Sequence, residues 1–233
     1  MELSWNAEGD WEPFCTQAAF EWQTVRELAA EVLQRDLYTC HRCSFRSRPS
    51  RQVFSGYMQL EAIGGDYDVR DPQEYVTVCP FCHANRHLQW ALESGNFRLI
   101  AAPWISRLEI VTVTRALLSV ITQLEHLYYA EAVQLYMHFE KCEASVATLI
   151  PVVPTSKDTR EENLAHFTRL LASVVDESLY PNRDLYLHPL RLLPKAKAYK
   201  QESNYWYQAV YKSYPLSKWE KMLAWKQERI SEQ

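Results

Sequence analysis

The sequence predicts an α+β protein that is mainly helical, with one short β-hairpin between two pairs of cysteines. Only 5 of its 233 residues are glycine and 47% are hydrophobic, a composition typical of packed helices and unlike that of a disordered chain. Apolar residues recur at helical spacing over several long stretches, whereas the strand-like runs lie between Cys43 and Cys79. A chain of this length can bury a core, either as one large domain or as a small module with a second layer.

Four of the six cysteines form two Cys-x-x-Cys pairs, Cys40 with Cys43 and Cys79 with Cys82. Each pair places two sulfur atoms on one tight turn, and two such turns supply the four thiolates of a closed tetrahedral zinc site. The alternatives to a zinc site are that these four cysteines form disulfides or that their spacing is due to chance. A closed shell leaves no open position for a substrate, so the expected ion is structural, and by analogy with zinc fingers it contributes about 10–16 kcal/mol.

The elements around these cysteines follow from periodicity and turn residues. We expect a helix at 16–35, strands at 52–63 and 75–78 around a turn at 64–66, and a helix at 83–92. The predicted order is therefore helix, knuckle, β-hairpin, knuckle, helix.

The rest of the chain has the apolar periodicity of amphipathic helices. We expect them at 106–124, 129–146, 163–179 and 217–230. The predicted organisation is an N-terminal extension at 1–15, a metal-binding module at 16–100, a helical hairpin at 101–154 and a helical C-terminal region with a partner-facing tail at 155–233.

Charge and hydropathy narrow the class of function. The formal net charge is -4, which makes the chain a poor candidate for a generic nucleic-acid binder. A membrane-spanning helix needs about 18 uninterrupted apolar residues, and the nearest stretch, 108–124, is interrupted by Glu109 and Arg115. The first ten residues are acidic where a secretory leader is basic. We expect a cytoplasmic protein without direct membrane insertion.

Two segments, Arg35-Asp-Leu-Tyr-Thr-Cys-His-Arg-Cys43 and Tyr75-Val-Thr-Val-Cys-Pro-Phe-Cys-His83, are similar to the HNH, or treble-clef, metal nucleases. In those nucleases a histidine on the first strand of the finger activates the attacking water, and helix side chains help to hold a divalent ion. Here no histidine lies between Cys43 and Cys82, and Glu74 stands where the family usually has an asparagine. The resemblance therefore implies the fold of this family without its catalytic residues, and no catalytic residue is assigned.

A divergent HNH endonuclease is the alternative. His83 and His87 are four residues apart and could share one helix face, either as metal ligands or as a partly exposed pair at a helix start. The other candidates are Glu61 as a base, with Asp66, Asp68 or Asp71 as metal ligands. Aspartates in such a glycine-containing turn more often close the turn by bonding their own backbone.

A closer resemblance includes the flanks of the finger. The segments Gln-Arg-Asp-Leu-Tyr-Thr-Cys-His-Arg-Cys43, Gly-Asp-Tyr-Asp68, Tyr-Val-Thr-Val-Cys-Pro-Phe-Cys82 and Arg-Leu-Leu-Pro-Lys-Ala-Lys197 together resemble the DotN (IcmJ) family of type IVB secretion systems. The similarity extends over residues 20–100 and recurs at 190–206. The N-terminal stretch and the tail after Lys200 lie outside it.

The resemblance to the DotN family implies an assembly subunit and not an enzyme. DotN-like proteins keep an HNH-like zinc fold without the nuclease residues, and they bind the cytoplasmic C-terminal region of the coupling ATPase DotL beside DotM, IcmS and IcmW. The resemblance also implies one structural zinc ion. It further implies that the protein is held at the inner membrane by its binding to that complex. The sequence leaves open whether such a machine moves protein effectors or conjugative DNA, and a zinc-dependent nucleic-acid adaptor is a third possibility.

Two sets of residues are candidates for a partner surface. Trp206, Trp219 and Trp225 lie near the C-terminus, where they either face a partner or fix the terminus onto the body of the protein. The second set is Arg46 and Arg48, which with Arg42 and Arg51 surround Phe45. These arginines could contact nucleic-acid phosphates, an acidic partner segment or solvent alone, and the acidic net charge favours the last two.

Overall fold

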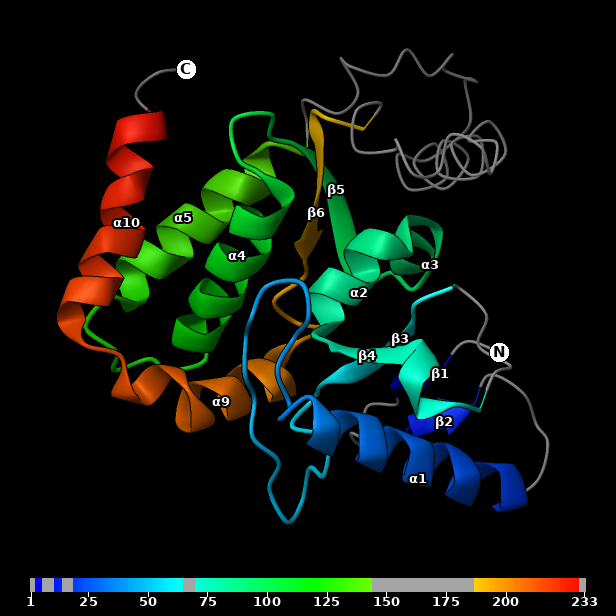
Figure 1. Ribbon diagram of the computed structural model, residues 1–233. Helices are drawn as coiled ribbons and strands as arrows, with labels where there is room; N and C mark the ends of the chain where they lie inside the picture. Colours follow the sequence, from blue (N-terminus) through cyan, green and yellow to red (C-terminus); the bar gives the residue numbers. More distant parts are fainter. Residues whose placement is uncertain (1–2, 6–10, 14–18, 65–69, 144–186, 231–233) are drawn as a thin grey trace. The chain divides into compact units, whose positions relative to one another are not determined.

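The computed structural model describes residues 3–5, 11–13, 19–64, 70–143 and 187–230 (Figure 1). This part of the chain is a mixture of helices and small antiparallel sheets of two strands each. It divides into two compact units. The first comprises Met1–His83 with Gln208–Lys212, and the second comprises Ala84–Tyr207 with Ser213–Gln233.

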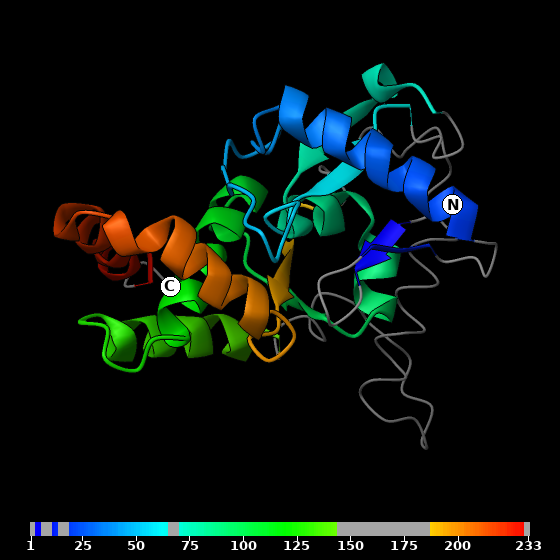
Figure 2. The ribbon, with the colours of Figure 1, turned by 90° about the horizontal axis from the view of Figure 1, so that it is seen from below.

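The first unit is built from helix α1 (Ala19–Arg35) and a hairpin of β3 (Gln59–Ala62) and β4 (Tyr75–Val78). Helix α1 packs on both strands, and Figure 2 shows it beside them from a second direction. The helix contributes an apolar stripe at helical spacing, made of Val25, Leu28, Ala29, Val32 and Leu33. All four residues of β3 are buried, so this strand is covered on both faces.

The predicted order of helix, cysteine pair, hairpin, cysteine pair and helix is confirmed. The first strand is shorter than the predicted 52–63, because Gly56 and Tyr57 have φ angles of 60° and 61°, which an extended strand does not accommodate. The helix predicted at 83–92 is two short helices, α2 (Pro80–Arg86) and α3 (Leu88–Glu93), since His87 between them leaves helical geometry. At the N-terminus, where only an extension was predicted, β1 (Leu3–Trp5) pairs with β2 (Trp11–Pro13).

The second unit contains two packed helices and a strand pair. Helix α4 (Arg107–Ile121) and α5 (Tyr129–Lys141) confirm the helices predicted at 106–124 and 129–146, and they pack on each other. Every residue of α4 from 113 to 120 is buried, so this part of the helix is covered on all sides, whereas Leu108 and Thr112 in its first turns are exposed. None of the helices in the described part of the chain is long and apolar enough to cross a bilayer.

The strand pair of the second unit corrects one predicted boundary. Strand β5 (Phe97–Ala101) pairs antiparallel with β6 (Leu190–Pro194), and neither strand is among those that the sequence predicts. The boundary predicted at residue 100 therefore falls inside β5, because this pairing joins the end of the predicted metal module to the C-terminal region. The boundary at 154 and the helix predicted at 163–179 lie outside the described residues.

Two of the three tryptophans considered for a partner surface are buried. Trp206, in α9 (Lys200–Ala209), is 0% exposed, and Trp219, in α10 (Leu216–Ile230), is 3% exposed. The Trp219 ring packs on His126 at 5.3 Å between ring centres. These two buried indoles agree with the second alternative given for them, in which they fix the C-terminal segment onto the body of the protein. The side chain of Trp225 lies outside the described residues.

We expect Gly56→Ala to destabilise the first unit by about 2–4 kcal/mol, because a left-handed residue with a side chain costs about 1–2 kcal/mol before any clash. A Cβ at Gly56, whose φ is 60°, would lie 2.5 Å from the Ser47 carbonyl oxygen. Unfolding in urea measures this loss in the free energy of unfolding. Gly95→Ala, with φ of 71° and nothing within 4 Å of the new Cβ, is expected to cost only about 1 kcal/mol. An equal loss in both variants would contradict the close approach to Ser47.

Candidate metal centre

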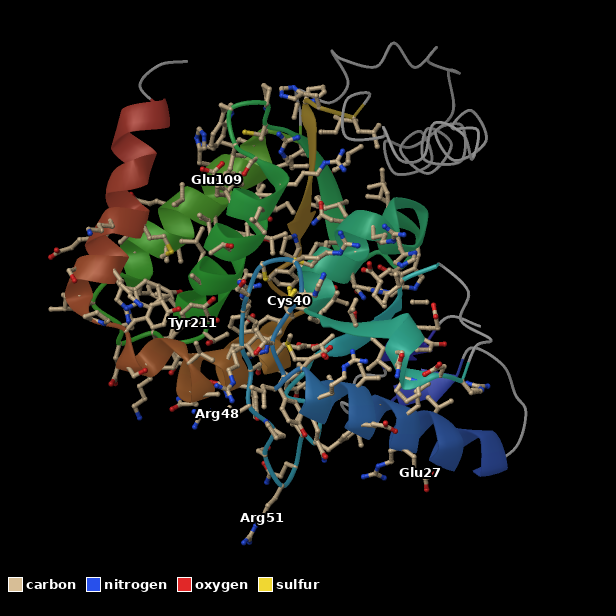
Figure 3. All side chains as sticks on the ribbon, in the orientation of Figure 1. Glu27, Cys40, Arg48, Arg51, Glu109 and Tyr211 are labelled. Atoms are coloured by element: carbon tan, nitrogen blue, oxygen red, sulfur yellow. The ribbon has the colours of Figure 1, made fainter. Side chains whose placement is uncertain are left out.

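The two cysteine pairs meet in the first unit. Cys40 (labelled in Figure 3), Cys79 and Cys82 are buried and Cys43 is half-buried. The four sulfur atoms all lie within 4.8 Å of one another. The Sγ atoms of Cys43 and Cys79 are 3.8 Å apart. A disulfide needs about 2.05 Å, whereas four sulfurs placed about 2.3 Å from a central ion lie about 3.8 Å apart. The cluster therefore fits a four-coordinate metal ion.

Backbone hydrogen bonds hold each pair as a turn. In the first turn the amide of Ser44 donates to the Cys40 carbonyl at 2.9 Å, and the amide of Cys40 donates to the Phe45 carbonyl at 2.8 Å. In the second, strand β4 leads directly into Cys79, whose carbonyl accepts from the His83 amide at 3.0 Å. Pro80 opens helix α2 between these two residues, where its missing N–H has no helical partner to lose.

Asp36 connects the end of α1 to the strand that carries the second cysteine pair. Its Oδ2 accepts from the Thr77 amide at 2.8 Å, and its Oδ1 accepts from Arg35 Nε at 2.8 Å. The Thr77 carbonyl in turn accepts from the His41 amide at 2.8 Å, inside the first cysteine pair. Burial raises the pKa of Asp36, but the hydrogen bonds from Arg35 and Thr77 outweigh it, and the net pKa is lower than usual.

The electrostatics of the cluster favour a bound cation. Burial raises the pKa of the Cys79 thiol well above its ordinary value, and contact with Cys40, Cys43 and Cys79 raises that of Cys82. Contact with Cys43 also opposes ionisation of Cys40, but hydrogen bonds from Cys79 and Cys82 lower the pKa of Cys40 to about 7. One thiolate is thus stabilised at the expense of the others, and only a metal ion allows all four sulfurs to be anionic together.

Glu61, the residue considered as a catalytic base, forms an ion pair with an arginine. Glu61, on β3, is 2% exposed and forms an ion pair with Arg42, whose Nε lies 3.4 Å from Glu61 Oε2. The pKa of Arg42 is raised, first by this hydrogen bond to Glu61. The same Oε2 lies 4.0 Å from Nδ1 of the buried His83. Glu61 therefore lies between the guanidinium of Arg42 and the imidazole of His83.

The other acidic candidates do not gather around Glu61 in the described structure. Asp71 caps a 3-10 helix (Pro72–Glu74), and its Oδ1 accepts from the Gln73 amide at 2.9 Å, as expected of a turn-forming aspartate. Glu74 lies in the same short helix and is exposed. Asp66 and Asp68 lie outside the described residues. His83 lies in α2, but His87 follows the end of that helix and has non-helical angles, so the two histidines do not share one continuous helix as predicted.

The arginines after the first cysteine pair are exposed, but the aromatic ring among them is not. Arg46 donates from Nε to the Leu37 carbonyl at 3.0 Å, and Arg48 and Arg51 are exposed. Phe45 is 6% exposed and stacks on Tyr211, with ring centres 6.1 Å apart and an angle of 15°. Phe45 is therefore unavailable to stack on a nucleic-acid base, which removes one support for a nucleic-acid adaptor.

A scan of the chain against models of protein families finds no match, and a search of curated proteins finds none either.

Removal of one cysteine of the cluster is expected to abolish metal binding. We expect about one zinc ion per chain in the purified wild type, a loss of that ion in Cys79→Ser, and unfolding of the first unit by a strong chelator. Metal content and circular dichroism measure these effects. Cys142→Ser, which changes a thiol outside the cluster that donates to the His138 carbonyl, is the matched control. Equal metal content in the two variants would contradict the assignment of the four cysteines as the metal ligands.

We expect Asp36→Asn to lower the stability of the first unit by about 1 kcal/mol at pH 7. Because the folded protein lowers the pKa of Asp36, its contribution is present above the unfolded pKa, about 3.9, and is lost as the pH falls through the folded pKa. The urea midpoint of the variant should lie below that of wild type by a constant amount from pH 8 to pH 5. A difference that disappears already at pH 6 would refute the assignment to Asp36.

Proposed function

We propose that the chain is a non-catalytic assembly subunit of a type IVB secretion system, or of a related conjugative machine. In this proposal it binds the cytoplasmic C-terminal region of a DotL-like coupling ATPase, beside DotM-like and IcmS/IcmW-like subunits, and reaches the inner membrane only through that complex. The resemblance of the motifs around the cysteines to the DotN family supports the choice of machine.

The proposal that this subunit is not an enzyme rests on the surroundings of Glu61 in strand β3. Where a nuclease of this type has a histidine, the described strand has the buried Glu61, paired with Arg42, followed by the apolar Ala62. This ion pair gives the Glu61 carboxylate a partner within the finger itself. This arrangement supports a structural use of the finger.

The metal in this proposal is one zinc ion bound by Cys40, Cys43, Cys79 and Cys82. Four thiolates in tetrahedral arrangement are a ligand set typical of structural zinc, and they leave no position for water or substrate. The order of helix, cysteine pair, hairpin, cysteine pair and helix supports a treble-clef arrangement. Here the ion holds the turn from which the arginine segment begins.

The partner surface is assigned to the first unit, because Trp206 and Trp219 are buried. Arg46 and Arg48 are exposed and follow the first cysteine pair. Leu37 and Ile63, at 60% and 56% exposure, add apolar surface to the same unit. A partner segment with carboxylates beside apolar residues has the complementary chemistry, and it would contact the arginines at a position that the metal keeps fixed.

A direct test is co-purification with the C-terminal region of a DotL-like ATPase from the same genome. We expect a stable complex, weakened at least tenfold by Arg46→Ala with Arg48→Ala. Lys197→Ala with Lys200→Ala removes the same charge from two exposed lysines and should leave the affinity unchanged. Failure of the zinc-loaded wild type to bind any such region would refute the assembly function.

A divergent HNH nuclease is the second candidate, favoured by the approach of Glu61 and His83 to 4.0 Å beside the cysteine cluster. It is tested with plasmid and single-stranded DNA in the presence of Mg²⁺, Mn²⁺ or Ni²⁺. The assembly function predicts no cleavage. Cleavage that is lost in Glu61→Ala and His83→Ala would establish the nuclease instead.

A further inference from the structure

His126 lies in the connection between α4 and α5, and three aromatic rings pack against its imidazole. The ring centre of Trp219, in the first turn of α10, is 5.3 Å away at an interplanar angle of 69°. Tyr207, on α9, is 5.7 Å away at 84°, and Tyr128, which follows in the connection, is 6.0 Å away at 47°. One half-buried histidine of the second unit therefore joins the α4–α5 connection to α9 and α10.

A hydrogen bond fixes the neutral form of this imidazole. Nδ1 of His126 accepts from the Tyr128 amide at 3.2 Å, so this nitrogen carries no proton in the structure. Tyr128 is the N-cap residue of α5, and its own side chain makes no capping hydrogen bond. The His126 carbonyl also accepts from the Tyr129 amide at 2.9 Å. The neutral imidazole thereby stabilises the start of α5.

The position of His126 disfavours protonation for three reasons. A proton on Nδ1 would face the Tyr128 N–H, and the hydrogen bond between them would be lost. The resulting cation would lie before the first turn of α5, where the helix dipole already concentrates positive charge. Burial among the rings lowers the pKa of His126. Each of these effects favours the neutral imidazole.

The carboxylates near His126 do not offset these effects. In the part of the chain that the structure describes, no carboxylate forms an ion pair with the imidazole, and Glu125 beside it in sequence is exposed. Glu220, on α10, and Glu131, on α5, act instead on the phenol of Tyr128, whose pKa is raised by desolvation and then by these two carboxylates. His126 therefore has no anionic partner that would stabilise its charged form.

Two other ionisable side chains lie on the helices that contact His126. Lys218, on α10, places its Nζ 4.6 Å from the centre of the Tyr214 ring, so a cation of that helix is bound to a neighbouring aromatic residue. On α9, burial raises the pKa of Glu202 to about 7. A raised carboxyl pKa favours the folded protein as the pH falls, so titration of Glu202 has the opposite sign to that of His126.

Trp219 connects this histidine to the packing of α10. It is 3% exposed, and it is the one buried side chain among those described for α10, residues 216–223. Helix α10 packs on α5, and Figure 1 shows the two helices side by side. The described part of α10 therefore depends largely on the contact between Trp219 and the rings of His126 and Tyr214.

We propose that His126 is a pH-sensitive latch, which holds α10 against the start of α5 at neutral pH and releases it on acidification. Because the folded protein favours neutral His126, the contribution of this residue is complete above the unfolded pKa, about 6.5. The contribution decreases as the pH falls from that value to the lower folded pKa. The latch belongs to the second unit and is independent of the metal centre and of the proposed assembly function.

Hydrogen–deuterium exchange of the full-length, zinc-loaded protein at pH 7.5 and pH 5.5 tests the latch. We expect the protection factors of the amides at 216–223, corrected for the pH dependence of chemical exchange, to fall about threefold or more at pH 5.5. Equal protection at the two pH values overturns the proposal.

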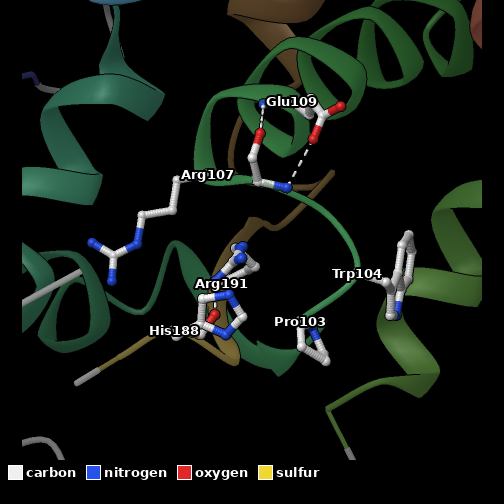
Figure 4. Close-up of a pocket in the computed structure, with 7 residues that line it drawn as sticks. Pro103, Trp104, Arg107, Glu109, His188 and Arg191 are labelled. Atoms are coloured by element: carbon white, nitrogen blue, oxygen red, sulfur yellow. Dashed lines mark hydrogen bonds between the residues drawn. The ribbon is translucent and has the colours of Figure 1, made fainter. Parts of the chain in front are cut away.

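Matched variants decide whether His126 is the responsible group. His126→Asn keeps an acceptor for the Tyr128 amide but cannot be protonated, so the loss of protection should disappear. His188→Asn, which changes an exposed histidine of the same unit (labelled in Figure 4), should retain it. An unchanged loss of protection in His126→Asn overturns the proposal.

Titration of the imidazole by NMR in the wild-type protein gives a second measurement that does not depend on the folding of a variant. We expect Nδ1 of His126 to be unprotonated at pH 7.5, and the residue to titrate below the ordinary histidine pKa of about 6.5. A proton on Nδ1 at pH 7.5, or titration above that pKa, overturns the proposal.

Discussion

Four sulfur atoms from two turns far apart in the sequence occupy one small volume, and the arrangement of the first unit depends on this constraint. The first turn follows α1, the second follows β4, and β4 pairs with β3, so an ion bound to both turns would also fix the hairpin against the helix. Burial opposes ionisation of Cys79, and contact with the other three cysteines opposes that of Cys82, so a bound cation is what would allow these sulfurs to be anionic together. A bound metal turns the same proximity into stability.

Neighbouring polar groups reinforce the same geometry without touching the sulfurs. Asp36 bonds the Thr77 amide, Thr77 bonds the His41 amide, and Arg35 donates to the Tyr75 carbonyl at 2.6 Å. The Arg42–Glu61 ion pair adds a link from the first cysteine turn to the middle of β3. In a nuclease this corner would need a free base and an accessible ion, whereas here its charged groups bond one another. The same contacts therefore stabilise this corner of the first unit.

The cysteine pairs, α1, α4 and β4 could be predicted because their signals are local: ligand spacing, helical periodicity and a short β-branched run. The Asp36 contact could not, because its partner Thr77 lies on a distant strand and one aspartate after a helix gives no distinctive pattern. Strand β6 was missed for a similar reason, since Leu-Arg-Leu-Leu-Pro becomes a strand only through its pairing with β5. The tryptophans show the limit of composition, because aromatic spacing alone does not distinguish the core from an interface.

The central claim is that one metal ion joins the two cysteine pairs through four sulfur ligands. X-ray absorption at the zinc edge of the purified protein measures the number and type of these ligands directly. The structure predicts four sulfur atoms at about 2.3 Å and no nitrogen or oxygen in the first shell. A shell with two or fewer sulfurs, or with histidine nitrogen among the ligands, would contradict the account.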